Sequence, residues 1–469
     1  MFPHSFPVRP ALAGALALAL SSAGLSPHPV VARGAPTVIA SDLIGRLASE
    51  MQATHPALRG LGRLADSERL NAASTRTWAD PEVQVSGAVY RESFMAAEQG
   101  DVAYGVTQRL PLLGKEKAAR QLADTAAEAA QARQQARVAE LRRDLVLALL
   151  DAAARRVVLD RIGDDVGWLS TQSAVAETRV ASGTESAALT LRLRNELDRR
   201  RTDWTNQAAL HEDALVAVRR LLGRVQPGPD EPYALAPIGP SITLSPALVR
   251  RAEAVEPSIR RSDADVRVAR STVEVTRRSA RPDVSLGVQA WHESATGSAA
   301  QGFFTLGVSI PWFNRDNYRR DLQRDRLRLD AAQDQLEDAR QQVRRDLHAL
   351  LTRIESARRD ALLQRDTILP RTRQLEASIA AQWTSGRADL RDLLDTRRQR
   401  ADAEINEAAA SAAYWAGIAE VMLRCGLDTF DAAFSQEPPE APFQSPSQPQ
   451  QPQRLQGQQQ QQPKQPRRP

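Results

Sequence analysis

The sequence predicts a mainly α-helical fold with a smaller membrane β part, built from one unit of two strands, a long helix and a shorter helix that occurs twice. Three observations lead to it. An alternating strand passes through a proline into a very long helix, first at residues 101–122 and again at 302–330. Proline and glycine breakers recur in register between the two halves of the chain. Aromatic residues make up only 4% of the chain, which suits Ala and Leu seams between helices.

Residues 1–32 are expected to be a secretory signal peptide. Arg9 precedes an apolar run over 11–20, and the small residues Ala23 and Ala32 each fit a cleavage site. No other stretch reaches the ~20 apolar residues that a membrane-spanning helix needs, and no cysteine follows the signal to carry a lipid anchor. We therefore expect the mature chain to be exported, and any part of it inside a membrane to consist of strands.

The first copy of the unit is predicted to cover residues 41–223. A helix begins near Ser41, which either Ser41 or Asp42 can cap, and Pro56 opens a second helix. The alternating stretches 82–90 and 101–110 then form two strands of one hairpin, joined by a polar tip.

A long helix is predicted over 115–181, and it would measure roughly 100 Å if unbroken. Its seam residues are spaced by three and four positions, as in a coiled coil: Val138, Leu141, Leu145, Ala148, Ala152 and Leu159. Ser182 and Gly183 reverse the chain, because glycine tolerates the left-handed conformation at a helix end. A shorter helix returns over 186–221.

The Pro- and Gly-rich stretch 224–246 is predicted to be a linker, after which the unit repeats over 247–430. The breakers that match between the two copies are Pro56 with Pro257, Pro81 with Pro282, Pro111 with Pro311, Gly183 with Gly386, and Gly223 with Gly426. The second long helix is predicted over 315–384. Its seam is expected to contain Val343, Leu347, Leu350, Ile354, Ala357, Ala361, Ile368, Leu375 and Ile379. Residues 431–469 are dominated by Pro, Gln and Arg and are expected to form a disordered tail.

The sequence carries no recognisable motif of an enzyme, a cofactor site or a metal site, and we expect none of these. The segment LGKEKA at 113–118 fails as a phosphate-binding loop, because Glu116 stands where Ser or Thr is required. The histidines are scattered, and Cys425 is the only cysteine. The net charge is +5, but basic and acidic residues interleave along the helices, which indicates solvated faces rather than a nucleic-acid surface.

The strands determine the expected assembly. Each has the length of a tilted transmembrane strand, yet four strands cannot close a barrel, and open edges are not tolerated in lipid. Three copies would supply twelve strands for a β-barrel, and their helices, which lack a lipid-compatible surface, would continue it as a periplasmic helical barrel. The residues expected to face lipid are Val83, Val85, Val89, Phe304, Leu306, Val308 and Ile310.

These features together resemble the TolC-like family of outer-membrane efflux proteins, over about residues 41–430. The motifs that carry the resemblance are TQRLPLLGKEKAAR at 107–120, SIPWFNR at 309–315, ASGTESAAL at 181–189 and TSGRADLRDLLD at 384–395. The motifs LPLLGK and IPWFNR look most like those of the branch that works with heavy-metal pumps of the resistance-nodulation-division type. Asn317 departs from that branch, where Gly is common, and so do His55 and Glu256, where Asn is usual.

The resemblance implies a homotrimeric exit duct in the outer membrane of a Gram-negative bacterium. It implies two protein partners, a periplasmic adaptor and an inner-membrane resistance-nodulation-division pump, and it favours small solutes such as heavy-metal cations as the cargo. Two alternatives share this architecture, a drug-efflux duct and an exit duct for type I protein secretion. A periplasmic coiled-coil scaffold is a further alternative, although it leaves the membrane-length strands unexplained.

Two sets of site residues follow. The helical bends should form the tips that contact the adaptor: Ser182, Gly183, Thr184, Ser385, Gly386 and Arg387. Asp389, Asp392 and Asp395 recur at intervals of three, so adjacent members share a helix face, and a trimer would place any pore-facing member in a ring of three carboxylates. The resemblance assigns Asp392 and Asp395 to the closed pore entrance. The alternative is a solvated helix face in which Asp395 pairs with Arg398.

Overall fold

A computed structural model describes residues 36–76, 78–88, 101–183, 186–292, 301–385 and 387–434. The predicted signal peptide, Val89, Thr184, Gly386 and the chain beyond 434 lie outside these ranges. Among the described helices, none combines the length and the apolar composition needed to cross a lipid bilayer.

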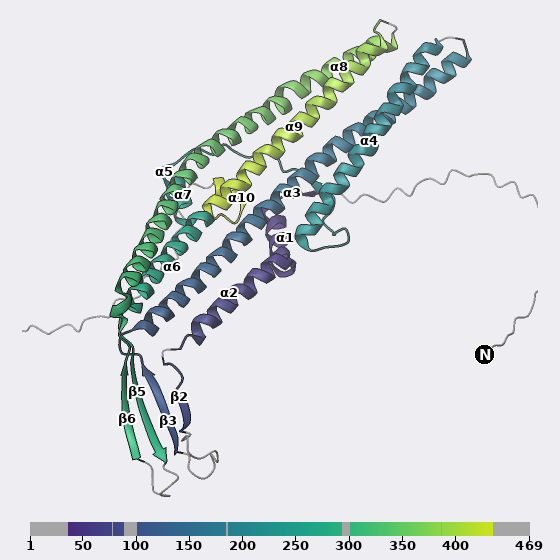
Figure 1. Ribbon diagram of the computed structural model, residues 1–469. Coiled ribbons are helices and arrows are strands. Elements are labelled where there is room, and N and C mark those ends of the chain that lie inside the picture. The colour runs from purple at the N-terminus through teal and green to yellow at the C-terminus, as the bar shows by residue number, and fades with distance from the viewer. Residues whose placement is uncertain are drawn as a thin grey trace, which may run out of the picture.

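The molecule is elongated, with a β-sheet at one end and two helical hairpins at the other (Figure 1). The first copy of the unit contains α1 (Ser41–Thr54), α2 (Pro56–Ser74), β2 (Glu82–Ala88), β3 (Asp101–Leu110), α3 (Lys115–Ala181) and α4 (Ala187–Leu222). The second contains α5 (Pro246–Val255), α6 (Pro257–Ser279), β5 (Val284–His292), β6 (Gln301–Val308), a 3₁₀ turn (Pro311–Asn314), α7 (Arg315–Leu363), α8 (Leu369–Thr384) and α9 (Leu390–Cys425). The order of elements therefore occurs twice.

The equivalent helices of the two copies begin and end for the same reasons. Pro56 and Pro257 each stand at the first position of a helix, where a missing N–H is harmless. Gly223 and Gly426 end α4 and α9 with φ of 68° and 57°, a left-handed conformation that is costly for other residues. These two pairs of shared breakers are thus shared helix boundaries.

The sheet has the order β2-β3-β5-β6 and is antiparallel throughout. Each copy contributes one hairpin, and β3 and β5 join the two hairpins in the middle. The outer edges of β2 and β6 have no partner strand among the described residues. A single chain therefore presents two open sheet edges.

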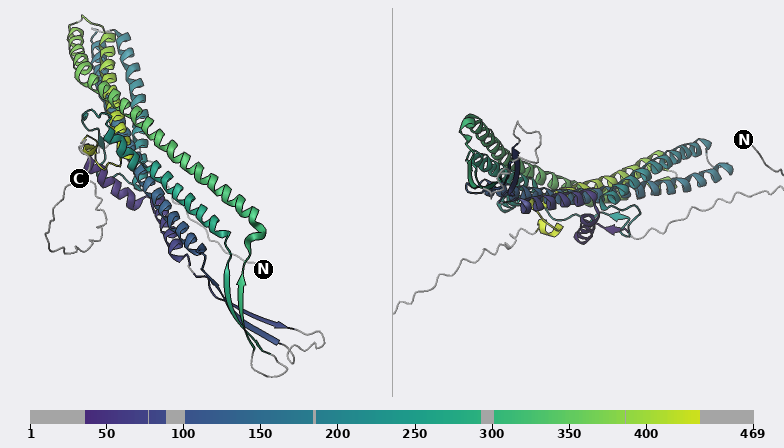
Figure 2. Two further views of the ribbon diagram at one scale, coloured as in Figure 1. Left: turned by 90° about the vertical axis from the view of Figure 1, so that its left-hand side faces the viewer. Right: turned by 60° about the horizontal axis from the view of Figure 1, so that its bottom comes forward.

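The long helices lie side by side in one curved layer (Figure 2), in which α3 contacts α2, α4, α6 and α9. Most residues of the predicted seams lie inside it: Leu141, Leu145, Ala152 and Leu159 on α3, and Val343, Leu347, Leu350, Ile354 and Ala361 on α7 are buried. The main apolar core fills the middle of the molecule, between these helices and α1.

The predicted continuous helix over 315–384 is wrong at one point, because a π-helical turn, Gln364–Ile368, separates α7 from α8. Pro370 explains the turn: it has no N–H, and its ring clashes with the carbonyl four residues earlier. The extra residue per turn shifts the inward face by one position. Leu369 is buried where Ile368 was predicted, and Leu375 is 45% exposed.

The predicted linker also contains structure. Within it, β4 (Tyr233–Ala234) pairs in parallel with β1 (Thr37–Val38), and the linker carbonyl of Ala236 accepts a hydrogen bond of 3.1 Å from Trp415 Nε1. The predicted tail begins too early, since α10 (Phe430–Phe434) packs Phe430 on the Trp415 ring at 4.6 Å. Both segments are apolar enough to cover the core.

Candidate functional site

One face of the sheet is apolar across all four strands. Directly paired residues of antiparallel strands point to the same face, and the pairing aligns Val83, Val106, Val288 and Phe304 in one row. The neighbouring row toward the helices aligns Gln108, Leu286 and Leu306. Gln108 does not break the apolar face, because its side-chain amide donates to the Ala79 carbonyl at 2.7 Å.

The residues predicted to face lipid lie on this apolar face or continue it. Their side chains are between 51% and 85% exposed in the single chain: Val83, Val85, Phe304, Leu306, Val308 and Ile310. Val89 lies outside the described residues, and Ile310 follows the last residue of β6. Large apolar side chains in such a contiguous band indicate a surface that is covered by something other than water.

The opposite face of the sheet is more polar. One row aligns Glu82, Thr107, Gly287 and Thr305, and the next contains Gln84 and Gln289 beside Phe303. A sheet with one apolar and one polar face matches the alternation of a membrane strand, which has one side toward lipid and the other toward a lumen.

The predicted tip residues lie at the end of the molecule opposite the sheet. Ser182 and Ser385 follow the last residues of α3 and α8, and Gly183 has φ of 73°. Arg387 Nε donates to the Ser385 hydroxyl at 3.2 Å. Both helical hairpins therefore end in short exposed turns at the same end of the molecule (Figure 1).

The three predicted pore acids lie at the start of α9 and are exposed in the single chain. Asp389 precedes the first helical residue, and its backbone N–H donates to Asp392 Oδ2 at 3.3 Å, so Asp392 also belongs to a capping box. Asp395 Oδ1 lies 3.5 Å from Arg398 Nη1, the pairing expected for a solvated face. The three acids do share one end of one helix, close to the tip.

Sequence reasoning missed a group of partly buried ions that joins the two helical hairpins, which we name the charged seam. Its acids and bases are Asp165, Glu196, Glu376, Glu404, Arg373, Arg397, Arg398 and Arg400. At its centre, Arg397 of α9 lies 3.1 Å from Glu376 on α8 and 3.5 Å from Asp165 on α3. The Arg397 guanidinium also covers the Trp168 ring of α3 at 4.4 Å.

The rest of the charged seam extends this centre. Arg400 reaches Glu376 at 2.9 Å and Glu404 at 3.3 Å, and Arg398 reaches Glu196 on α4 at 2.6 Å. Burial raises the pKa of Asp165, and the nearby Arg397 opposes that change. Removing one partner of a buried ion pair leaves the other charge unpaired and strongly destabilises a protein. The pairs of the charged seam therefore couple α3 and α4 to α8 and α9.

The π turn explains why the seam was missed. The predicted seam placed Leu375 inward, whereas the shifted face turns Glu376 inward, where its side chain is 13% exposed. The run TRRQR at 396–400 is the part of the sequence that could have indicated the charged seam, because three arginines beside one helix end require acidic partners if they are buried. Pairing Arg397 and Arg400 with Glu376 would have required the one-residue shift.

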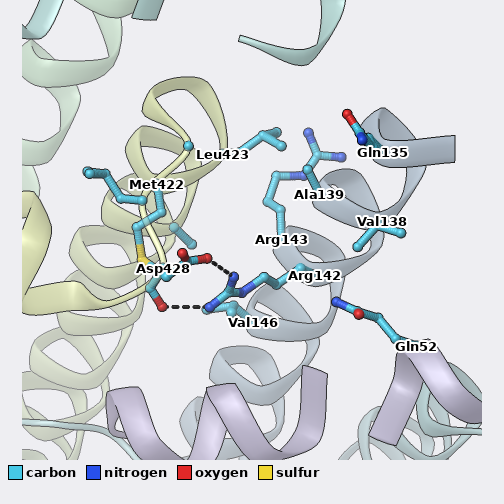
Figure 3. A pocket seen from close by; sticks show the side chains of 13 residues that line it. Gln52, Gln135, Val138, Ala139, Arg142, Arg143, Val146, Met422, Leu423 and Asp428 are labelled. Carbon is cyan, nitrogen blue, oxygen red and sulfur yellow. Dashed lines mark hydrogen bonds and ion pairs between the residues drawn. The ribbon is translucent and has the colours of Figure 1, made fainter. Parts of the chain in front are cut away.

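A cavity of about 260 Å³ lies elsewhere, between α3 and α9 beside the core (Figure 3). Arg142 crosses it and donates to Asp428 Oδ1 at 2.6 Å and to the Asp428 carbonyl at 2.5 Å. These bonds tie the segment after α9 to α3, which is a structural role. Within the part of the chain that the structure describes, no group of His, Cys, Asp and Glu is arranged to hold a metal ion.

Comparison with known proteins gives one family match and several shared folds. Residues 248–422 match the model of the outer membrane efflux protein family. Solved channels with the same fold include OprN, with TM-score 0.70 and 18% identity over 82% of this chain and 90% of that one, and CusC, with 0.71 and 15% over 84% and 95%. The CmeC channel of Campylobacter jejuni gives 0.68 and 12% over 83% and 86%. No curated protein sequence matches.

Proposed function

We infer that this chain is one subunit of an efflux duct. The family match over residues 248–422 and the shared fold support this inference, and both confirm the resemblance to TolC-like outer-membrane efflux proteins. Three copies would pool their strands into a twelve-stranded transmembrane barrel, and their helices would extend into the periplasm. The duct would export small solutes delivered by an inner-membrane pump through a periplasmic adaptor.

The observation that carries the proposal is the sheet. It has one apolar face, one polar face and two edges without a partner strand in the part of the chain that the structure describes. An isolated sheet of this kind would expose both its apolar surface and its backbone edges. Pairing each β2 edge with the β6 edge of a second copy satisfies the edges, and lipid covers the apolar face.

A charge on the lipid-facing side tests this placement. We expect Leu306→Arg to lower the stability of the membrane-inserted protein by about 2–4 kcal/mol, because the charge would enter the hydrocarbon layer. Thr305→Arg is the matched control on the opposite face and should cost far less. Urea titration of both variants in lipid vesicles measures the difference. Equal losses would show that the apolar face does not contact lipid.

Single-channel recording in planar bilayers tests the duct itself and its entrance. We propose that Asp392 and Asp395 line a narrow periplasmic entrance as rings of three carboxylates, which attract cations. Asp392→Asn with Asp395→Asn removes the charge while keeping a side chain that can cap α9. The double variant should show a weaker preference for cations and weaker block by divalent ions. Unchanged selectivity and block would place the entrance elsewhere, and absence of any conductance in the wild type would overturn the channel.

The adaptor is proposed to contact the helical tips. Cysteines at Thr184 and Arg387 should crosslink to the adaptor, whereas cysteines at Gln121 and Arg328, far along the helices, should not. Equal trapping at all four positions would refute the tip assignment.

The proposed cargo is heavy-metal cations. Deleting the gene should therefore sensitise cells to metals more than to drugs, whereas loss of a secreted protein would favour a type I secretion duct.

A further inference from the structure

Exposed apolar side chains gather where the sheet joins the helices. Trp78 precedes β2, Leu112 follows β3, and Trp312 and Phe313 follow β6. Their exposed fractions are 58%, 65%, 70% and 92%. None of them lies within a strand, so the alternation of membrane strands does not account for them.

This group lies at the helical end of the sheet, where the strands that form the apolar face end. Leu112 lies in the turn after β3, and Trp312 lies in the 3₁₀ turn after Ile310, which is itself half exposed. Tryptophan and phenylalanine at the end of a lipid-facing surface are typical of the membrane–water boundary, where ring and headgroup meet. The group therefore stands at the level where the helical end of the sheet leaves the membrane.

Basic residues crowd the same level. The segments 76–83, 109–117, 281–283 and 312–320 contain eight basic and five acidic residues. Several of the acids are already neutralised within the chain: Lys115 lies 2.8 Å from Asp283, and Arg319 lies 3.5 Å from Asp316. Each such pair also consumes one base, so the excess of three bases over acids in these segments remains.

Four bases at this level make no ion pair with an acid among the described residues: Lys117, Arg281, Arg315 and Arg320. Their side chains are exposed. Arg281 donates instead to the Leu113 carbonyl, at 2.8 Å, which leaves its charge uncompensated. The surface thus combines apolar rings with free positive charge.

We propose that these eight residues form a collar that binds anionic phospholipid headgroups at the periplasmic surface of the outer membrane, an inference that rests on the proposed membrane insertion of the sheet. The rings of Trp78, Trp312 and Phe313 enter the boundary layer, while the four free bases contact lipid phosphates. The partner is recognised by its charge, since basic residues near a surface attract anionic lipid. The collar would fix the depth of the barrel.

Native mass spectrometry of the delipidated full-length protein tests the collar, with phosphatidylglycerol or phosphatidylcholine added back. The wild type should bind phosphatidylglycerol in preference. The charge variant K117Q/R281Q/R315Q/R320Q should lose that binding by at least about tenfold, with phosphatidylcholine unchanged. The matched control replaces four exposed arginines of the helices that also make no ion pair with an acid in the described part of the chain: R59Q/R199Q/R353Q/R371Q. The control should bind both lipids as the wild type does.

Three other outcomes overturn the collar: no preference for phosphatidylglycerol in the wild type, retained binding in the charge variant, or equal loss in the control. The variant W312S/F313S tests whether a second copy of the chain, rather than lipid, covers the exposed rings. It should weaken binding of both lipids while the trimer mass persists, and loss of the trimer would assign the rings to a contact between copies. Failure of the proposed function would appear differently, as a wild type that forms no channels in planar bilayers.

Discussion

Two glycines inside the long helices show opposite packing roles. A Cβ on Gly417 of α9 would lie 2.3 Å from Ile354 Cγ1 of α7, whereas a Cβ on Gly167 of α3 would meet nothing within 4 Å. Ile354 is buried and β-branched, so it has little room to turn away. Gly417 therefore permits the close approach of α7 and α9, and Gly167 does not serve packing within the chain.

We expect Gly417→Ala to destabilise the protein by about 1–3 kcal/mol through overpacking. Gly167→Ala, the matched control, should stabilise it by about 0.5–1 kcal/mol, because alanine loses less backbone entropy in a helix. Chemical unfolding in one detergent compares the two. Equal changes in the two variants would contradict the packing assigned to Gly417.

Asp325 is the most buried charge on α7, with its side chain 2% exposed. Hydrogen bonds from Arg324 and from Thr276 of α6 lower its pKa to about 2. An unfolded aspartate has a pKa of about 3.9, so the folded state holds the charged form more strongly. This stabilisation is present above the unfolded pKa and is lost as pH falls toward about 2.

Asp325→Asn should therefore be less stable than the wild type at pH 7, and the difference should shrink as the pH falls below about 4. Asp321→Asn is the control, since Asp321 pairs with the same Arg324 at 3.0 Å but is half exposed, and it should cost only about 0–1 kcal/mol. Thermal unfolding across pH measures both variants. A difference for Asp325→Asn that did not change with pH would exclude the linkage.

Among the elements, the π turn between α7 and α8 has the largest consequence for the site. It moves Glu376 inward, toward Arg397 and Arg400. Deleting one residue inside the turn, Asp366, in a Pro370→Ala background that removes the proline clash, should convert it to a regular helix while both flanking faces keep their packing. Deleting Asp151, exposed on α3, should instead rotate everything downstream by about 100°.

The two deletions give a direct comparison by limited proteolysis and thermal unfolding. The Asp366 deletion should keep a protease-resistant folded protein with a midpoint close to the wild type. The Asp151 deletion should lose both properties. If the two deletions are equally damaging, the π turn does not act as an inserted residue.

Helix ends and the order of elements could be predicted from the sequence, whereas contacts between distant helices could not. Breakers such as Pro56 and Gly223 act locally, so helix ends and the repeated order were predictable, and strand alternation predicted which residues share the apolar face. The charged seam was not predictable, because its pairs join helices distant in sequence and depend on the shift caused by Pro370. The cap formed by Asp392 was also not predicted: the sequence suggested either a pore group or a pair with Arg391 or Arg397, whereas Asp392 accepts from the Asp389 N–H at the start of α9.

At the scale of the whole molecule, the exposed features of one chain call for more than one copy. Within the described residues, the single copy exposes an apolar sheet face, two unpaired sheet edges and acids clustered near one helical end. The proposed assembly, about an axis parallel to the long helices with lipid around the sheet and a lumen inside, would resolve each of these features. The charged seam would then hold the two hairpins of each copy together near the entrance.

The mass of the folded protein in detergent tests this claim most directly. We predict a particle of three chains, each of 51.4 kDa, since four strands per copy leave edges that only neighbouring copies can pair. Light scattering with correction for bound detergent measures this mass, and circular dichroism checks that the helices are intact. A stable, folded particle of one chain would contradict the account.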